Sequence, residues 1–522
     1  MKSIGVIVVH GVGEQTRFEH LEAVASNLYR ALRYGKNSRK HPQIQLNRGD
    51  QVARNSDEES WREAPATVSW QDESGEDIEL RFREVRWADL DMPMTWSRWF
   101  KLVGWCLGIS GVQLYDGSSN DSSMNAAGAK DGSGRFWIRA QLFGVSLLFF
   151  LLLITVDLIY GVVTRFGFAA KWLGSVRGLI YNYLGDVKLY QDWFVRSDDR
   201  LETLGEKSRV AIRRRMIRTL AQSANDVENG EIDGYYLFAH SLGTVVAFNG
   251  LMEPDLALPN YFTREEWNGE MCSGLKFEAE NRAPNKQMPK RPAWLEPKDA
   301  ISRAKLFGGF RGFLTMGSPL DKFAALWPAI VPVNSEPVPG EKRWVNVADV
   351  QDIVAGSIDD YPGCDEGVVG GLKLSNINWP GEWTLFSAHT SYWKAKRNSM
   401  RLIDRLIPWL EGGELEKPEP QLSSCFAKAL FWTSLGLLGL LLLWLAASTI
   451  WLFSKSGEMV EFAIQKAAGL DQTVGRCFWE IICDCSYLSS TLIWSVCILG
   501  TVVGIILLFS VVRGIWERAK FR

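Results

Sequence analysis

The segment FAHSLGTVV at residues 238–246 places Ser241 directly after an apolar run and directly before a run with helical character. A serine at such a strand–turn–helix junction is typical of a nucleophile elbow, which exposes its hydroxyl at the carboxyl edge of a sheet. The turn is so sharp that the residues two before and two after the serine must be small, and here they are Ala239 and Gly243. Ala239 departs from the usual glycine but adds only a methyl group. Because a helix N-terminus beneath the hydroxyl favours negative charge, the pattern predicts acyl transfer at Ser241.

A second motif of small residues, HGVG at 10–13, follows the β-branched run at residues 3–9. Glycines in such a loop let backbone N–H groups approach a substrate carbonyl, so the amides of Val12 and Leu242 are the candidates for an oxyanion hole. A Gly-x-Gly pair could instead mark a dinucleotide-binding loop. That alternative lacks the third glycine of its fingerprint, because Thr16 stands in its place.

A general base is easy to find, because the chain holds only five histidines. Four of them lie in the two motifs or precede the nucleophile in an expected helix and loop: His10, His20, His41 and His240. Only His389 lies downstream of Ser241, where the chain order Ser, acid, His that accompanies a nucleophile elbow requires the base. His389 would accept the proton of Ser241 and later give it to the leaving group.

An acidic partner for this base should follow a strand between the serine and the histidine. The segment WVNVADVQDIV at 344–354 offers Asp349 and Asp352 after an expected strand. Either carboxylate could orient an imidazole from this position, so both remain candidates. Asp321 and the acidic pair at 359–360 are less well placed, and we expect them to be solvated.

The elements that must position these residues alternate between strands and helices. Short apolar or β-branched runs predict strands at residues 3–9, 64–70, 78–87, 235–239, 312–316 and 344–348. Helical spacing occurs at 21–32 and in an Arg-rich stretch at 209–218, whose basic side we expect to be solvated or in contact with anionic headgroups. This order is typical of a mostly parallel α/β sheet. The Pro- and charge-rich segment 253–310 is too long for a plain connection and is expected to form a cap or lid.

Five ordered motifs together resemble bacterial lipase-like serine esterases of the α/β-hydrolase superfamily: HGVG, AHSLG, MGSPL, WVNVADVQD and AHTSYW. The resemblance covers residues 1–95 and 190–410. It implies the α/β-hydrolase fold and hydrolysis of carboxylic esters through an acyl-enzyme, without a metal or an organic cofactor. It also favours Asp352 over Asp349 as the acid. It does not reach the most apolar segments of the chain, and it fixes no substrate.

Composition narrows the class of protein. The chain has 522 residues, 47% of them hydrophobic and 23% charged, with a formal net charge of -2. These values exclude a disordered chain and a generally basic nucleic-acid binder. The eight cysteines are scattered, which suggests no disulfide framework, and no histidine accompanies the cysteines at 477–485 to form a zinc site.

The most apolar segments predict membrane spans. Uncharged runs between Lys428 and Lys455 and between Asp484 and Arg513 each exceed the roughly 20 residues that cross a bilayer core. A third run at 140–164 is interrupted only by Asp157. Because the residues before and after the insertion must meet in one site, the number of crossings within it must be even, which promotes the weaker segment at 96–115 to a fourth span.

The sequence therefore predicts residues 1–95 and 190–412 as one α/β-hydrolase domain, interrupted by a membrane hairpin at 96–165 and followed by another at 425–515. Lys and Arg flanking the hairpins place this domain on the cytoplasmic side of the inner membrane. The expected function is that of a multi-pass, membrane-anchored serine hydrolase. Its partners would be the lipid bilayer and a lipid or lipophilic ester, with no nucleic acid. The sequence leaves the oligomeric state open.

Two other functions fit the same residues. One is a catalytically inactive membrane scaffold that uses the fold to bind a partner. The other is an amidase or thioesterase, which would use the same serine, histidine and aspartate.

Overall fold

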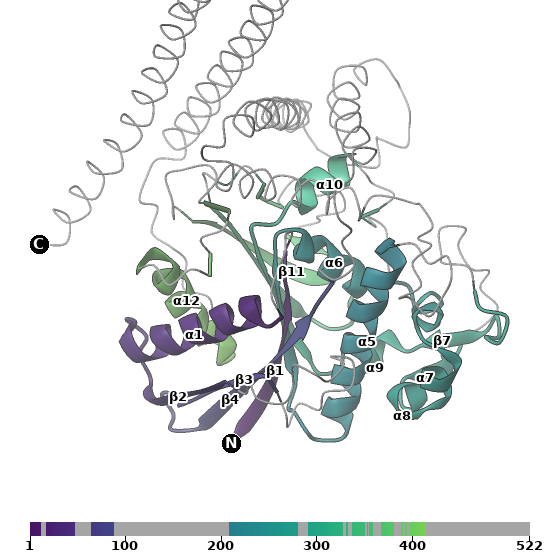
Figure 1. Ribbon diagram of the computed structural model, residues 1–522, viewed down its shortest axis with the longest axis horizontal. Coiled ribbons are helices and arrows are strands. Elements are labelled where there is room, and N and C mark those ends of the chain that lie inside the picture. The colour runs from purple at the N-terminus through teal and green to yellow at the C-terminus, as the bar shows by residue number, and fades with distance from the viewer. Residues whose placement is uncertain are drawn as a thin grey trace, which may run out of the picture. The chain divides into compact units, whose positions relative to one another are not determined.

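The computed structural model describes the parts of the chain in which the predicted site residues lie, with the exception of one loop (Figure 1). All described residues belong to one unit, made of Met1–Val145 and Leu179–Phe431. They are residues 1–11, 17–46, 64–87, 190, 208–279, 291–326, 330–331, 337–349, 352, 354–358, 367–379, 388–389, 392–393 and 397–413.

A mixed sheet of nine strands forms the centre of the described part, in the order β10-β11-β9-β8-β5-β1-β4-β3-β2. Its six adjacent parallel strands are β11 (Leu372–Trp379), β9 (Lys342–Asp349), β8 (Phe310–Met316), β5 (Tyr235–His240), β1 (Lys2–Val9) and β4 (Asp77–Val85). Antiparallel pairing adds β10 (Val368–Val369) at one edge and β3 (Ala66–Gln71) and β2 (Lys40–Leu46) at the other. The described chain is thus an α/β protein with a largely parallel sheet.

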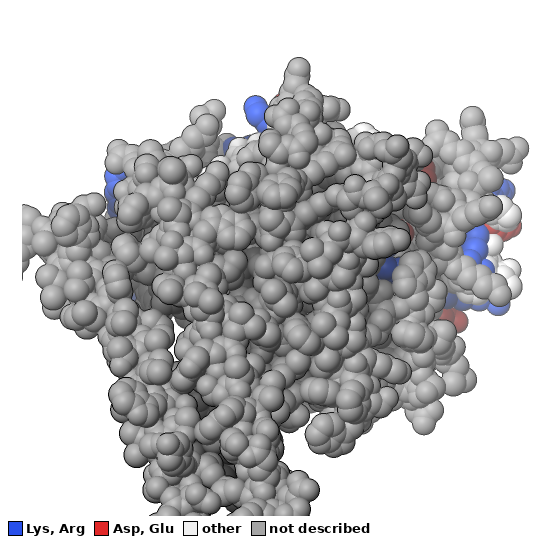
Figure 2. All heavy atoms as spheres, turned by 90° about the horizontal axis from the view of Figure 1, so that it is seen from above, with Lys and Arg blue, Asp and Glu red and all other residues white. Residues whose placement is uncertain are grey.

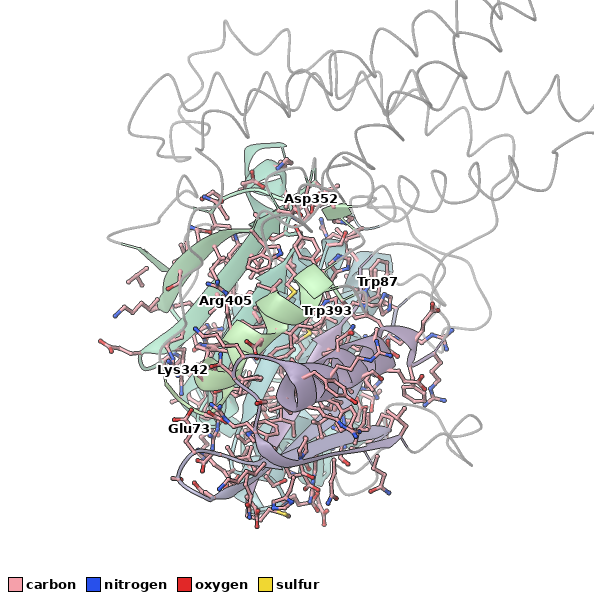
Figure 3. All side chains as sticks on the ribbon, turned by 90° about the vertical axis from the view of Figure 1, so that its left-hand side faces the viewer. Glu73, Trp87, Lys342, Asp352, Trp393 and Arg405 are labelled. Atoms are coloured by element: carbon pink, nitrogen blue, oxygen red, sulfur yellow. The ribbon has the colours of Figure 1, made fainter. Side chains whose placement is uncertain are left out.

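Helices cover both faces of this sheet, and the alternation of side chains in β1 shows how (Figure 1). Ile7 and Val9 belong to the apolar cluster that includes α5 (Ser208–Glu228) and α6 (Leu242–Leu251). Val6 and Val8 belong to the opposite cluster, with α1 (Glu19–Tyr34) and α12 (Arg397–Leu410). Successive residues of a strand point to opposite faces, so a β-branched run supplies both cores at once. Figure 3 shows α1 and α12 side by side on one face, and Asp352 at the opposite end of the sheet from Glu73.

The Arg-rich helix differs from its prediction. Arg209 is buried in α5, and Arg213 pairs with the buried Glu253 at 3.2 Å and donates to the carbonyl of Ile330 at 3.0 Å. Arg218 pairs with Glu266. The expectation of a solvated basic face is therefore wrong for these residues. Acidic partners from the segment after α6, Glu253 and Glu266, pack back onto the helix.

The segment predicted as a cap or lid contains several short elements and one pair of antiparallel strands. Three of its helices, η4, α8 and α9, contact α5. Residues 280–290 lie outside the described part, so a lid function stays a prediction. The elements are η4 (Leu258–Tyr261), α7 (Arg264–Asn268), α8 (Glu270–Ser273), β6 (Lys276–Glu278), β7 (Asp299–Ile301) and α9 (Arg303–Leu306).

All four predicted membrane spans, in 96–165 and 425–515, lie outside the described residues. Among the helices that are described, none combines the length and the apolar character needed to cross a bilayer.

Where described side chains are visible in Figure 2, basic and acidic ones occur close together at the right-hand edge of the view.

Candidate active site

Ser241 occupies the tight turn between β5 and α6, at the carboxyl end of a central strand. Its backbone has φ 54° and ψ -132°, a conformation that side-chain-bearing residues rarely adopt and that costs about 1–3 kcal/mol. Neighbouring backbone groups hold it there: the Ser241 N–H donates to the carbonyl of Met316 at 3.0 Å, and the Ser241 carbonyl accepts from Thr244 N at 2.9 Å. The strained turn is thus fixed from β8 on one side and from α6 on the other.

Two glycines make room for this turn. A Cβ on Gly243 would lie 2.6 Å from the carbonyl oxygen of Val9, and a Cβ on Gly11 would lie 2.6 Å from Cβ of Ser241. Both distances are shorter than any ordinary carbon contact, so α6 and the end of β1 approach each other only because these side chains are missing. The first glycine of the HGVG motif therefore lies directly against the serine, as expected.

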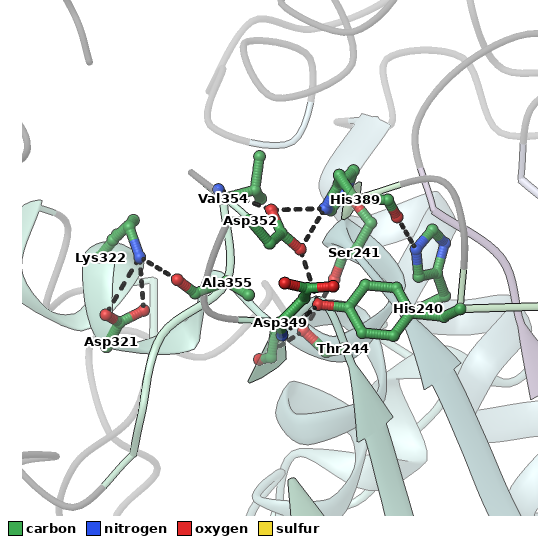
Figure 4. A network of polar contacts seen from close by, with 12 residues as sticks. His240, Ser241, Thr244, Asp321, Lys322, Asp349, Asp352, Val354, Ala355 and His389 are labelled. Atoms are coloured by element: carbon green, nitrogen blue, oxygen red, sulfur yellow. Dashed lines mark hydrogen bonds and ion pairs between the residues drawn. The ribbon is translucent and has the colours of Figure 1, made fainter. Parts of the chain in front are cut away.

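The structure brings Ser241, His389 and Asp352 together in one chain of contacts (Figure 4). His389 Nε2 lies 2.8 Å from Ser241 Oγ. His389 Nδ1 lies 2.9 Å from Oδ2 and 3.1 Å from Oδ1 of Asp352. All three side chains are buried. Because the carboxylate can only accept, Nδ1 carries the proton of the neutral ring, and Nε2 is left to accept a hydrogen bond from the serine hydroxyl.

Asp352 is held in its ionised form. Burial acts to raise its pKa, but the charge of His389, together with hydrogen bonds from His389, Val354 and Tyr392, outweighs burial and leaves the pKa below its ordinary value. The Val354 N–H donates to Oδ1 at 2.8 Å, and the Tyr392 hydroxyl donates to Oδ2 at 2.9 Å. A carboxylate that is charged and fixed at both oxygens can stabilise an imidazolium beside it.

Asp349, the other candidate acid, contributes to the site through its backbone. Its carbonyl accepts from Asp352 N at 3.0 Å, and its N–H donates to the hydroxyl of Tyr392 at 2.8 Å. Asp349 ends β9 and begins the turn that carries Asp352 toward His389. The carboxylate against His389 Nδ1 is that of Asp352.

Buried amide side chains support the loop that follows Asp352. Asn346 on β9 donates from Nδ2 to the carbonyl of Gly356 at 3.1 Å and to Oδ1 of Asn376 at 2.8 Å. Asn376 on β11 also accepts from the Ile358 N–H at 3.2 Å. These bonds tie residues 354–358 to the sheet, so the acid is carried by an anchored loop.

His240, next to the candidate nucleophile Ser241, packs on the candidate base His389. Its ring stacks on the ring of His389 with centroids 5.1 Å apart, and its Nε2 donates to the His389 carbonyl at 2.9 Å. On its other side the ring stacks on His20 at 5.6 Å. Burial, followed by the nearby charge of His389, lowers the pKa of His240 to about 3, and burial also lowers the pKa of His20. Both rings are therefore neutral at neutral pH and add no charge beside the base.

The remaining predicted residues fall as follows. Leu242 is the first residue of α6, where backbone N–H groups have no partner within the helix, whereas Val12 lies outside the described residues. Asp321 was expected to be solvated, but its side chain is about 10% exposed and pairs with Lys322 at 3.2 Å. Lys322 in turn donates to the Ala355 carbonyl at 2.9 Å. The Asp321–Lys322 pair is thus attached to the loop that follows Asp352.

Two contributors to the site, Tyr392 and Asn346, were not singled out from the sequence. Tyr392 acts through Asp352, 40 positions away, and Asn346 acts through Gly356 and Asn376, 10 and 30 positions away. The local signal was that both residues lie in motifs that carry the family resemblance, Tyr392 in AHTSYW and Asn346 in WVNVADVQD.

No group of three or more His, Cys, Asp or Glu side chains in the described part of the chain is arranged to hold a metal ion. Comparisons of the chain with models of known protein families, with curated proteins and with solved structures found no match. The geometry of the site is therefore the basis on which a function is proposed.

Proposed function

We propose that the protein is a serine hydrolase that cleaves carboxylic esters through an acyl-enzyme formed on Ser241. The observation that carries the proposal is the unbroken chain of contacts from Asp352 through His389 to Ser241, with heavy-atom distances of 2.9 and 2.8 Å. The nucleophile stands on a strained turn at the carboxyl end of a central parallel strand. This placement is what the α/β-hydrolase fold requires, and we propose that fold for the domain.

The reaction would run in two half-reactions. His389 Nε2 takes the proton from Ser241 Oγ while Oγ attacks the ester carbonyl, and the Leu242 N–H stabilises the oxyanion that forms. The intermediate collapses when the imidazolium gives the proton to the departing alcohol, leaving an acyl group on Ser241. Water then attacks this acyl group, with the same transfer of a proton to and from His389, and releases the carboxylic acid. Asp352 stays ionised and stabilises the imidazolium in both halves.

We further propose that the enzyme is anchored in the inner membrane by the two predicted hairpins, with its site on the cytoplasmic side. The support is the sequence: long uncharged runs near the C-terminus and apolar segments within the insertion between β4 and α5. An anchored site meets substrates dissolved in the bilayer more often than soluble ones, which favours a lipid or another lipophilic ester.

The test is covalent labelling with a fluorophosphonate probe, using the full-length chain in detergent. Wild type should label, and Ser241→Ala should not. Ser318→Ala is the matched control, because Ser318 is also buried, with its hydroxyl 2.9 Å from Oγ1 of Thr244. If Ser241→Ala labels as strongly as wild type, the assignment of the nucleophile is wrong.

A wild type that does not label at all would favour the inactive scaffold. Turnover of matched ester, thioester and amide substrates would then identify the bond that a labelling enzyme cleaves. Comparison of lipids from cells that carry wild type or Ser241→Ala would name the substrate class, because the uncleaved species should accumulate in the variant.

A further inference from the structure

Tyr392 connects the two aspartates of the site. Its hydroxyl donates to Oδ2 of Asp352 at 2.9 Å and lies 2.8 Å from the backbone nitrogen of Asp349. A backbone N–H can only donate, so the tyrosine oxygen accepts there, and its own hydrogen points to Asp352. The Tyr392 side chain is buried, so solvent does not compete for these two hydrogen bonds.

The same short stretch of chain carries both Tyr392 and the base, three residues apart. Gly317, at φ 64°, makes room for both: a Cβ there would lie 3.0 Å from Cε2 of Tyr392 and 3.2 Å from Cε1 of His389. The two rings are therefore packed against one turn, and a movement of one side chain would displace the other.

We propose that Tyr392 is a positioning residue of the hydrolase, which acts through Asp352 on the orientation and basicity of His389. This role rests on the proposed function. The physical reason is that Oδ2 of Asp352 accepts from two donors at the same distance of 2.9 Å, the ring Nδ1 of His389 and the hydroxyl of Tyr392. The tyrosine fixes the plane of the carboxylate and withdraws part of its charge, and both effects pass to the imidazole.

Removal of the Tyr392 hydroxyl should shift the pH–rate profile in a direction that a merely structural role would not produce. Without this donor, Asp352 holds more negative charge and stabilises the imidazolium more strongly. The base then becomes protonated at a higher pH, so the acidic limb of the pH–rate profile should move upward. A hydroxyl that only supports the fold would lower stability and leave this limb in place.

Other titratable groups face this pair from neighbouring elements. Burial keeps the histidines among them neutral, with the pKa of His240 at about 3, so they do not change charge in the range of the test. Burial and the adjacent carboxylates raise the pKa of Tyr392 well above its ordinary value, so the hydroxyl keeps its proton. In the described part these groups are Asp349 on β9, His240 on β5 and, behind it, His20 on α1.

The experiment measures the second-order rate constant of fluorophosphonate labelling across pH, with the full-length protein. Tyr392→Phe should reduce the rate about tenfold to hundredfold at its best pH, as expected for loss of a hydrogen bond to a charged group. It should also move the acidic limb up by roughly one pH unit. The replacement Tyr392→3-fluorotyrosine keeps the ring and makes the hydroxyl a stronger donor, so it should move the limb in the opposite direction. The 3-fluorotyrosine variant also allows the test to be made if Tyr392→Phe does not fold.

Tyr235→Phe is the matched control, because Tyr235 is likewise buried and its hydroxyl donates to the Leu306 carbonyl at 2.8 Å, outside the site. This control should lose stability without a change in the profile. If both Tyr392 variants keep the wild-type limb, the positioning role is wrong while the hydrolase proposal stands. If wild type shows no labelling that depends on Ser241, the hydrolase proposal is wrong and this role falls with it.

Discussion

The two sides of the site are held by different means. On the nucleophile side, Ser241 is fixed by backbone hydrogen bonds and by the missing side chains of Gly11 and Gly243. On the acid–base side, His389 and Asp352 are fixed by hydrogen bonds from side chains, among them Tyr392 and His240. The first arrangement depends on close approach of the backbone at glycines, which are visible in the sequence, and the second depends on polar side chains that only the fold brings together.

This difference predicts how strongly each side of the site responds to substitution. A sharp turn packed against a sheet has no room to relax, so an added methyl group should disturb it strongly. A network of hydrogen bonds loses one contact at a time, so its outer members should give smaller effects than its centre. Substitutions on the two sides should therefore differ in how much activity they remove.

Asp352→Asn strikes the centre of the acid–base side. The amide keeps the shape of the side chain but favours the wrong tautomer of His389 and removes the charge that stabilises the imidazolium. We expect a loss of kcat of roughly 10³- to 10⁴-fold, measured by ester turnover. Asp349→Asn keeps the backbone N–H that meets Tyr392 and should cost less than about tenfold. Equal losses in the two variants would contradict the assignment of the acid.

Gly243→Ala tests the nucleophile side. Its new methyl group would press on the backbone carbonyl of Val9, which cannot move without distorting β1. The nucleophile and the Leu242 amide should shift together, and we expect activity to fall about 100-fold. Gly250→Ala, in the same helix, is the control, because its Cβ would meet side-chain atoms of Met216 and Leu220 and no backbone atom of another element. An active Gly243→Ala enzyme would show that the turn is looser than the distances indicate.

His240→Phe tests an outer member of the network. The ring stack is kept, but the hydrogen bond to the His389 carbonyl is lost, and we expect a loss of activity of about tenfold. Its effect on stability depends on pH. The pKa of His240 is about 3 in the folded state against an ordinary 6.5, so the unfolded chain binds the extra proton and wild type loses stability as pH falls from 6.5 toward 3.

This loss should amount to about 2 kcal/mol at pH 5 for one histidine, and His240→Phe should remove it. Chemical denaturation of wild type and variant at pH 5 and pH 7.5 measures the difference. His41→Phe, at an exposed position on β2, is the control for replacement of a histidine by phenylalanine. An equal dependence in wild type and His240→Phe would show that another group is responsible.

The same contrast separates what the sequence predicts from what it does not. All six expected strands are present, because each is an apolar run buried on both faces or a clear alternation. β2 was missed because it is polar and contains Pro42, and β11 because the adjacent polar residues Ser375 and Asn376 break its alternation. Edge and half-buried strands depend on their neighbours for recognition.

For the site, the glycines and the chain order led to Ser241 and His389, since both signals are local or sequential. The choice between Asp349 and Asp352 was not determined by the residues alone, because it depends on a turn that only the folded loop reveals. The acidic partner of the basic helix could not be predicted either, since Arg213 pairs with Glu253 across 40 residues of sequence. Long-range pairing of side chains has no local signature.

The sheet order also bears on how the chain reaches its fold during synthesis. β1 pairs with β4 on one side and β5 on the other, and a bond joins Ser3 to Asp233 across 230 residues of sequence. At about 5–20 residues per second, a ribosome needs roughly 12–46 s to make that stretch. During this time the edge of β1 that will pair with β5 has no partner. The nascent N-terminal half-sheet therefore exposes an unpaired strand edge, and the turn at Ser241 can form only after the inserted segment has been synthesised.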